Sequence, residues 1–261
     1  GSDTTAVALA ASLEADICEI YTDVDGVYSA DPRIVPEARK LDHIFYDEML
    51  ELASLGAKVM HSRSIELGKN YGVRICVRSS FNDERGTDIV AESSDREQVI
   101  VRGAALKKKL ARVEFANVPH RPGVAGKIFG RVAERGILVD DIIQVINEDG
   151  CSVDISFTID GADMEAAQIL ASELAAEIPC GRPLIRTGCA KVSVVGVGMR
   201  TQTGVAARMF EALHQANVNI ENISTSEIVV SCVIQEEDGE KALRAVHAAF
   251  ELEQDPKRRH V

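Results

Sequence analysis

Apolar and polar positions follow a pattern that occurs twice in this chain, about eighty residues apart. Residues 123–125 align with residues 204–206, and both triplets read Gly-Val-Ala. The alignment continues without a gap to Ile142, and along it Ile137 stands opposite Val218. The other apolar matches are Phe129 with Phe210, Val139 with Ile220, and Ile142 with Ile223. One folding unit has therefore been copied.

Each copy predicts the same order of elements. Residues 111–118 and 190–197 alternate with the period of a strand, and a turn closed by glycine follows each. An amphipathic helix and a second apolar strand come next. The period is longer than that of a solenoid, and two copies are too few for one. The pattern favours paired small α+β modules, of a kind that often binds effectors where two modules meet.

The first ninety residues alternate helices and strands in a different order. Helices are predicted over residues 4–13, 47–56 and 63–71, and strands over residues 17–21 and 73–78. This order indicates an α/β sheet with partly parallel strands. The polar residues 79–95 predict a linker, and residues 98–104 predict a further strand before the first copy.

Composition and charge exclude two classes of partner. The formal charge is -12, and aromatic residues make up only 4%, so the basic field and stacking surfaces of a nucleic-acid-binding protein are missing. We interpret the basic residues 257–259 as a solvated tail. No apolar run reaches the ~20 residues that span a bilayer, and no signal peptide opens the chain. We therefore expect a cytoplasmic protein of two or three domains with no membrane partner.

Cysteines and histidines stand singly along the chain. No pair of cysteines has the CxxC spacing of a zinc or redox site, and most of them lie in apolar, strand-like segments. They predict buried, reduced thiols, and no structural metal is predicted. The cysteines are Cys18, Cys76, Cys151, Cys180, Cys189 and Cys232.

Two segments near the start of the chain have residues that suit phosphate. Ser2 and Asp3 directly precede a predicted helix, whose first N–H groups favour an anion, although the same residues also suit an ordinary helix cap. Asp23 and Asp25 follow a buried strand, where open α/β sheets bind ligands, and their carboxylates suit a magnesium ion or a hydroxyl. The spacing excludes an EF-hand.

Positive charge comes next along the chain. Arg33 can make bidentate contacts with phosphate, and Lys58 adds a point charge. Singly these residues suit a surface, but together they indicate a phosphate site. A second glycine-rich segment, Gly196 to Gly204, superficially matches a dinucleotide fingerprint. We reject that match, because its third glycine is misplaced and the sister copy has no glycine pair.

The family that these residues resemble is aspartate kinase. Its catalytic domain, an amino-acid-kinase fold, ends in strings similar to GSDTTAVALAASLEADICEIYTDVDGVYSADPRIV, DEMLELASLGAKVMHSRSIE and VRSSF. The two copies resemble its paired ACT domains. The resemblance implies an α/β fold class: a partial amino-acid-kinase sheet domain over residues 1–92, followed by two ferredoxin-like βαββαβ ACT domains over 99–187 and 188–252. The strand 98–104 is expected to pair with the second ACT domain.

The resemblance also implies an activity. Aspartate kinases use ATP and Mg²⁺ to phosphorylate the side-chain carboxylate of L-aspartate, which gives 4-phospho-aspartate. Ser2 and Asp3 match a catalytic segment near the ATP phosphates and the substrate. The residues that match the nucleotide site are Thr22, Asp23, Tyr28, Asp31, Arg33 and Lys58. The family's catalytic domain begins with a phosphate-binding segment that this chain does not contain, so the isolated 261-residue chain is expected to be inactive.

An effector site for lysine, threonine or both is implied as well. Bare backbone at a glycine turn suits a carboxylate, and Asn and Gln side chains suit an ammonium group. Asn217 and Asn219 equally suit the end of a helix. His120 stands where related chains often carry Asp. One wall of the site matches Gly123, Ala125, Val139, Asp140 and Gln144, and the facing wall matches Val205, Ala206, Asn217, Asn219, Ile220, Ser226 and Glu227.

Two hypotheses from different classes follow. The first is an aspartate kinase that lacks its N-terminal portion. The second is a regulatory, amino-acid-binding subunit that assembles with a catalytic chain. Another amino-acid kinase, such as one acting on glutamate, is a weaker third, because such kinases lack paired ACT modules. Exposed sheet edges in ACT domains predict a homo-oligomer, at least a dimer, through residues 99–252.

Overall fold

The computed structural model describes residues 1–57, 59–92 and 100–255. Contacts divide the chain into two compact units. The first comprises Gly1–Lys107, Lys191–Ile234 and Asp238–Val261, and the second comprises Lys108–Ala190 and Gln235–Glu237. The boundaries at 1–92, 99–187 and 188–252 remain predictions. Within the described ranges, no helix combines the length and the apolar character needed to cross a membrane.

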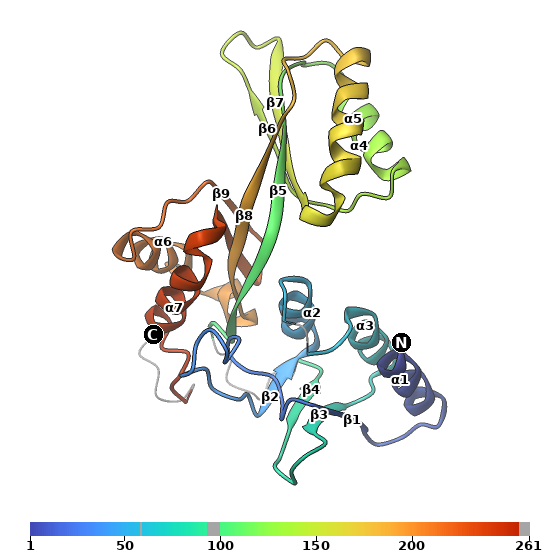
Figure 1. Ribbon diagram of the computed structural model, residues 1–261. Coiled ribbons are helices and arrows are strands. Elements are labelled where there is room, and N and C mark those ends of the chain that lie inside the picture. The colour runs from blue at the N-terminus through green and yellow to red at the C-terminus, as the bar shows by residue number, and fades with distance from the viewer. Residues whose placement is uncertain (58, 93–99, 256–261) are drawn as a thin grey trace. The chain divides into compact units, whose positions relative to one another are not determined.

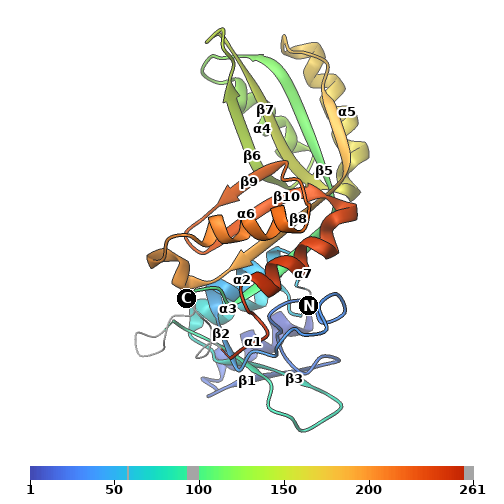
Figure 2. The same cartoon turned by 90° about the vertical axis from the view of Figure 1, so that its left-hand side faces the viewer.

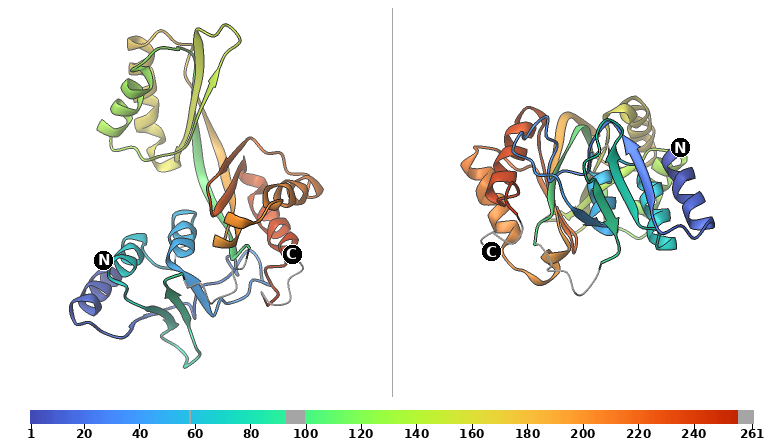
Figure 3. Two further views of the ribbon diagram at one scale, coloured as in Figure 1. Left: turned by 180° about the vertical axis from the view of Figure 1, so that it is seen from behind. Right: turned by 90° about the horizontal axis from the view of Figure 1, so that it is seen from below.

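A four-stranded sheet occupies the first ninety residues. Its strand order is β1-β3-β4-β2; β1 is parallel to β3, β2 is parallel to β4, and β3 is antiparallel to β4. The expectation of partly parallel strands is confirmed. In Figure 3 the N-terminal helix α1 lies beside α3, and these helices are in contact. The elements are α1 (Ser2–Ser12), β1 (Cys18–Thr22), β2 (His43–Phe45), α2 (Tyr46–Ser54), α3 (Ser62–Tyr71), β3 (Ile75–Ser79) and β4 (Thr87–Val90).

The predicted linker over residues 79–95 is wrong, because β4 lies inside it. This strand is short and pairs with β3 through a polar hairpin, so its own periodicity is too brief to detect. Gly86 permits the pairing: a Cβ there would stand 1.9 Å from the carbonyl oxygen of Val77. The predicted strand 98–104 is also displaced, since the strand begins at Gly103, and residues 98 and 99 lie outside the described residues.

The second unit has the predicted βαββαβ order. Its strands neighbour one another as β8-β5-β7-β6. Figure 1 shows α4 and α5 on one face of this sheet, where Ile128, Phe157 and Leu174 form a buried core. The elements are β5 (Gly103–Pro119), α4 (Val124–Glu134), β6 (Val139–Ile146), β7 (Ser152–Asp160), the 3-10 turn η1 (Gly161–Asp163), α5 (Met164–Glu177) and β8 (Leu184–Val195).

The second copy of the module lies in the first unit. Its strands neighbour one another as β5-β8-β10-β9, so β5 supplies the fourth strand. In Figure 2 α6 and α7 lie side by side over this sheet. The elements after β8 are η2 (Val197–Thr201), α6 (Val205–Gln215), β9 (Asn222–Thr225), β10 (Val229–Gln235), η3 (Glu236–Asp238) and α7 (Gly239–Ala249).

Backbone geometry repeats between the copies. Gly123 has a φ of 89° and Gly204 a φ of 90°, and each directly precedes a helix of 11 residues. At the other end of these helices Gly136 and Asn217 have φ of 67° and 53°. Such left-handed residues are where helices commonly end. The duplication seen in the sequence is therefore a duplication of conformation.

The expectation of buried cysteines is confirmed at four positions and wrong at Cys151, which is exposed, and at Cys180, which is half-buried. Cys151 follows Gly150 in the turn between β6 and β7, where its N–H donates to Asp149 Oδ1 at 2.9 Å. The turn, and not an apolar run, sets its surroundings. Burial raises the pKa of Cys232 to about 12, so this thiol is protonated at neutral pH.

A buried carboxylate joins the kinase-like segment to the second module. Glu48, in the first turn of α2, accepts from Phe45 N at 3.2 Å, from Arg102 Nε at 3.2 Å and from Val197 N at 3.1 Å. Its side chain has 0% exposure and that of Arg102 has 3%. The Arg102 guanidinium also lies 5.5 Å from the ring centroid of Phe45. Around this cluster, one apolar core includes residues of both segments, among them Val197 and Ile228.

Substitution of either partner is expected to leave the other charge buried and unpaired. We therefore expect Glu48→Gln and Arg102→Met each to lower the free energy of unfolding by roughly 3 kcal/mol. The double variant should lose clearly less free energy of unfolding than the two single variants lose together, because neither buried charge then remains. Urea unfolding followed by circular dichroism measures all four proteins. Additive losses would show that Glu48 and Arg102 do not act as a pair.

Candidate functional site

The candidate nucleotide site lies where β1 and β3 end. These strands are parallel, and Thr22 pairs with Ser79 at their carboxyl ends. Ser80 N donates to Thr22 O at 2.8 Å, so the chain segments that follow the two strands leave from the same edge. This edge of an α/β sheet is where ligands bind. The loop position predicted from the sequence therefore matches the topology.

Five of the six predicted nucleotide-site residues lie at the end of β1 or in the loop that follows it, namely Thr22, Asp23, Tyr28, Asp31 and Arg33. Arg33 Nε and Nη2 donate to the two carboxylate oxygens of Asp31, at 3.0 and 2.8 Å. The hydrogen bond to Asp31, the charge of Asp31 and the charge of Asp23 raise the pKa of Arg33. Thr22 Oγ1 donates to Asp23 Oδ1 at 3.0 Å. The Arg33 side chain is nevertheless 85% exposed, so its charge is presented to solvent.

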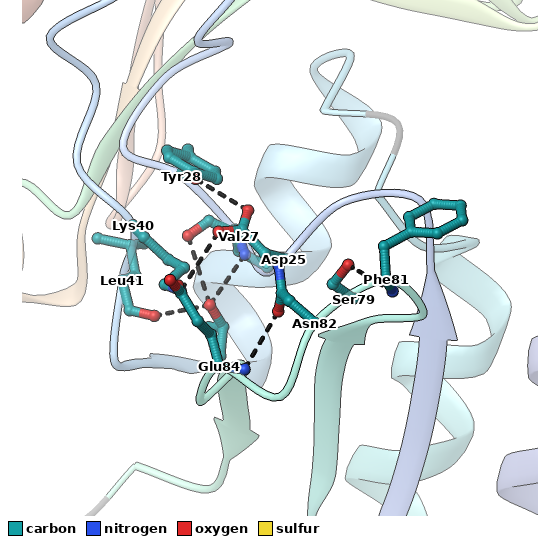
Figure 4. A network of polar contacts seen from close by, with 10 residues as sticks. Asp25, Val27, Tyr28, Lys40, Leu41, Ser79, Phe81, Asn82 and Glu84 are labelled. Atoms are coloured by element: carbon teal, nitrogen blue, oxygen red, sulfur yellow. Dashed lines mark hydrogen bonds and ion pairs between the residues drawn. The ribbon is translucent and has the colours of Figure 1, made fainter.

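A polar network fixes the base of this loop (Figure 4). Tyr28 Oη donates to Asp25 Oδ1 at 2.8 Å, and Lys40 Nζ donates to Asp25 Oδ2 at 3.3 Å. Lys40 Nζ also donates to Glu84 Oε2 at 2.9 Å, which ties the loop to the β3–β4 hairpin. Burial alone would raise the pKa of Asp25, but the hydrogen bonds from Tyr28 and Lys40 outweigh it and hold the pKa below its ordinary value.

Thr87 completes the network from β4. Its Oγ1 accepts from Val27 N at 2.8 Å and donates to Leu41 O at 2.6 Å, and the residue is fully buried. Sequence reasoning missed Thr87, Lys40 and Glu84, because Thr87 and Glu84 come from segments far along the chain and Lys40 meets Asp25 only through the fold. Their positions at the ends of neighbouring strands are the signal that a correct strand order would have supplied.

Ser2 and Asp3 lie inside the first turn of α1. The N-cap is Gly1, and no side chain caps the helix, so the interpretation of Ser2 or Asp3 as a cap is wrong. Ser2 Oγ donates to Asp3 Oδ1 at 3.2 Å. Burial raises the pKa of the Cys18 thiol, and the negative charge of Asp3 raises it further. Asp3 therefore lies near Cys18, the first residue of β1. Lys58 lies outside the described residues.

The carboxylates of the loop differ in their availability to a metal ion. In the described parts of the chain, no three His, Cys, Asp or Glu side chains form a metal-binding group. Asp25 is engaged by Tyr28 and Lys40, whereas Asp23 is exposed and bonded to a hydroxyl. Mg²⁺ is commonly held by one or two carboxylates together with substrate phosphates. Asp23 therefore fits an ion that arrives with a nucleotide, and the loop does not form an all-protein cage.

A pocket of about 340 Å³ lies in the second unit, around the N-terminus of α4. Three predicted effector residues line it, namely Gly123, Ala125 and Gln144, while Val139 and Asp140 lie outside the lining. The other lining residues are Pro119, His120, Arg121, Pro122, Val124, Val153 and Ile155. Backbone N–H groups at the helix start, an amide and two basic side chains suit a carboxylate ligand.

The other predicted effector residues lie in the first unit. Val205 and Ala206 open α6, and Asn217 follows its end with a φ of 53°. The interpretation that Asn217 ends a helix is therefore confirmed, and Asn217 O accepts from Lys241 Nζ at 3.3 Å. The remaining four stand after α6 and on either side of β9: Asn219, Ile220, Ser226 and Glu227. Their role in effector binding stays a prediction.

Known proteins match this chain along nearly its whole length. Residues 1–79 match the amino acid kinase family and residues 192–250 match the ACT domain. An aspartokinase of Pseudomonas aeruginosa is 48% identical over 255 residues, which are 97% of this chain and 62% of that protein. The chain thus spans less than two thirds of the length of this curated relative.

Solved structures agree with these matches. Aspartokinase III of E. coli, solved with aspartate and ADP, superposes with a TM-score of 0.83 at 28% identity and covers 96% of this chain and 56% of that one. The same enzyme, solved with lysine and aspartate, superposes with a TM-score of 0.78 at 29% identity. This match covers 95% of this chain and 55% of that one. The regulatory subunit of aspartate kinase from Thermus thermophilus superposes with a TM-score of 0.55 at 40% identity. This match covers 58% of this chain and 99% of the subunit.

The fold and these matches define the class: part of an amino-acid-kinase domain followed by ACT modules. The particular family follows from the identities over long stretches. This chain belongs to the aspartate kinase family.

Removal of the Tyr28 hydroxyl is expected to raise the pKa of Asp25, because burial of the carboxylate remains while one hydrogen bond is lost. The folded-state pKa of Asp25 lies below its unfolded value of about 3.9. The stability it contributes is therefore present above that value and lost as the pH falls through the folded-state pKa. Tyr28→Phe should accordingly destabilise the protein more at pH 7 than at pH 3. Carbon-detected NMR titration measures the pKa, and Tyr71→Phe, at an exposed tyrosine, is the matched control.

Proposed function

We propose that the protein to which this chain belongs is an aspartate kinase that transfers the γ-phosphoryl group of ATP to the side-chain carboxylate of L-aspartate. The observation that carries this proposal is 48% identity to an aspartokinase over 97% of the chain, together with the amino acid kinase match at residues 1–79. The complex of the E. coli relative with aspartate and ADP supports the choice of ligands.

The transfer itself asks for positioning and charge neutralisation more than for covalent help. A carboxylate oxygen of aspartate attacks the γ-phosphorus, the bond to the β–γ bridging oxygen breaks, and ADP leaves with that electron pair. Arg33 is suited to the phosphates, because Asp31 orients a guanidinium whose side chain faces solvent. Thr22, Asp23 and Tyr28 would line the nucleotide loop, and Ser2 and Asp3, in the first turn of α1, would supply the catalytic segment that the family resemblance implies.

Mg²⁺ would supply further charge neutralisation when it is bound with the nucleotide. Asp23 is the residue of this loop that would hold it, since Asp25 already accepts from Tyr28 and Lys40. The contribution of the chain is then to fix the loop, through the network around Asp25 and Thr87, so that Asp23 and Arg33 face the same ligand.

We also propose that lysine, threonine or both regulate the enzyme at the ACT modules. The pocket at the start of α4 supports this, because Gly123, Ala125 and Gln144 line it and its N–H groups suit an α-carboxylate. The complex of the E. coli relative with lysine is a further support. Arg121 also lines the pocket, and its positive charge disfavours a ligand with a second ammonium group. Of the two amino acids, threonine therefore suits this pocket better.

Assembly through the ACT modules is proposed as well. β6 is an edge strand in the second unit, and its Ile142, Val145 and Ile146 are more than half exposed. Such an edge is usually covered by pairing. Light scattering of the chain at micromolar concentration tests for a homo-oligomer.

A regulatory subunit without catalysis is the second candidate. The match to the Thermus thermophilus regulatory subunit favours it, because 58% of this chain covers 99% of that subunit. The amino acid kinase match at residues 1–79 favours the first candidate. A subunit of this kind would bind the effector and not a nucleotide.

Nucleotide binding separates the two candidates. We expect the 261-residue chain to bind Mg-ADP in calorimetry and the protein at its full natural length to release ADP from ATP in an aspartate-dependent coupled assay. Arg33→Met should weaken Mg-ADP binding about 10- to 100-fold, since a charge-assisted contact to phosphate is worth ~1.5–3 kcal/mol. Arg182→Met, at an exposed arginine of the second unit, is the control. Absence of aspartate-dependent ADP release at full length would refute the kinase.

Effector binding is expected to depend on the pocket in the second unit. Gln144→Ala should weaken threonine binding about 2- to 10-fold, because it removes about one hydrogen bond to the ligand. Gln168→Ala, at an exposed glutamine on α5, should leave binding unchanged. Isothermal titration with threonine and with lysine measures both affinities. If Gln144→Ala and the unchanged chain bind threonine with equal affinity, this pocket is not part of the effector site.

A further inference from the structure

We propose that helix α7 of the second ACT copy positions the candidate nucleotide loop, and that His247 is the residue through which it does so. The inference rests on the proposed function in one respect, that a nucleotide binds at the loop after β1. All residues involved belong to the first unit, so their contacts are described within one compact body.

Ser29 is the point of attachment in the loop. It follows Tyr28 directly, stands two residues before Asp31, and is fully buried. Its Oγ is hydrogen-bonded to His247 Nε2 at 3.0 Å and accepts from Arg39 N at 2.9 Å. Its carbonyl oxygen accepts from Ala104 N at 2.7 Å. A residue between two predicted ligands of the nucleotide is thus held by α7 and by β5, both parts of the ACT copy.

A second contact fixes the other side of the loop. Arg244, one turn before His247 on α7, donates from Nε to Ile34 O at 2.9 Å. Ile34 is adjacent to Arg33, the exposed guanidinium proposed to meet the phosphates. Contacts at Ser29 and Ile34 enclose the stretch that contains Asp31 and Arg33, so a shift of α7 would move both ends of that stretch together.

The opposite end of α7 touches a predicted effector residue. Lys241 Nζ donates to Asn217 O at 3.3 Å, at the end of α6. α6 and α7 are also in contact, and Figure 2 shows them beside each other. One rigid helix therefore contacts the proposed effector wall near its N-terminus and the nucleotide loop near its C-terminus. Such a helix can transmit a shift only if the two ligands favour different positions of it.

His247 is placed for this role by burial as well as by geometry. Its side chain is 2% exposed, and Glu253 Oε2 lies 3.8 Å from its Nδ1. A buried polar side chain with a hydrogen bond across two segments fixes their relative position more strictly than apolar packing does. His214, on α6 of the same module, is exposed and makes no such bridge to the loop in the described structure.

The test compares His247→Leu, His247→Gln and the control His214→Leu in the 261-residue chain, with Mg-ADP as the probe. We expect His247→Leu to weaken Mg-ADP binding about three- to tenfold, the effect of one lost hydrogen bond. Hydrogen exchange of the peptide 27–35 should become faster, while exchange in β1 and β3 stays unchanged. The glutamine can still bond to Ser29 Oγ, so His247→Gln should restore both readouts to near the original values.

Two outcomes would overturn the proposal. One is unchanged exchange of peptide 27–35 in His247→Leu, and the other is a glutamine variant as impaired as the leucine variant. A general loss of packing would instead raise exchange in β1 and β3, and this too counts against positioning. If the original chain binds no Mg-ADP, the exchange comparison still decides whether α7 holds the loop, whereas the proposed kinase activity is decided separately by the ADP-release assay at full length.

Discussion

The first unit depends on the placement of one fully buried carboxylate. The Glu48 side chain has 0% exposure, and an unmatched charge there would cost several kcal/mol. Three donors from three segments meet it, from Phe45, Arg102 and Val197. The kinase-like helix α2, the chain entering β5 and the turn after β8 must therefore converge on one point. This requirement makes the kinase-like segment and the second ACT copy parts of one core.

In the first unit, polar contacts between residues close in the sequence differ in effect from contacts between distant segments. The Arg33–Asp31 pair is local and exposed, so it orients a charge without adding much stability. The contacts of Ser29, Thr87 and Lys40 are buried or half-buried and connect the loop to distant segments. The loop after β1 thus combines buried supports with an exposed guanidinium that Asp31 orients.

Much of this architecture could be predicted from the sequence, for identifiable reasons. The two copies could be recognised in the sequence because apolar positions recur with a constant offset. The structure bears this out, since Gly123 and Gly204 have the same left-handed φ. The helices of the first ninety residues were visible by their period. β4 was not, because four residues carry too little periodicity and its register depends on Gly86 approaching Val77. The same limit applies to the site. Thr22, Asp23, Asp31 and Arg33 are neighbours in sequence, whereas His247 meets Ser29 only through the fold.

The order of the strands bears on how the two modules arose. Residues 108–190 enter along β5 and leave along β8, which are neighbouring strands, and each of these strands continues into the other copy. The first module is therefore nested inside the second, between its last strand and its first. A simple head-to-tail repeat would give two self-contained modules, whereas here β5 completes the sheet of the second copy. Neither copy can be excised at a single linker without removing a strand from its sister, which ties their inheritance together.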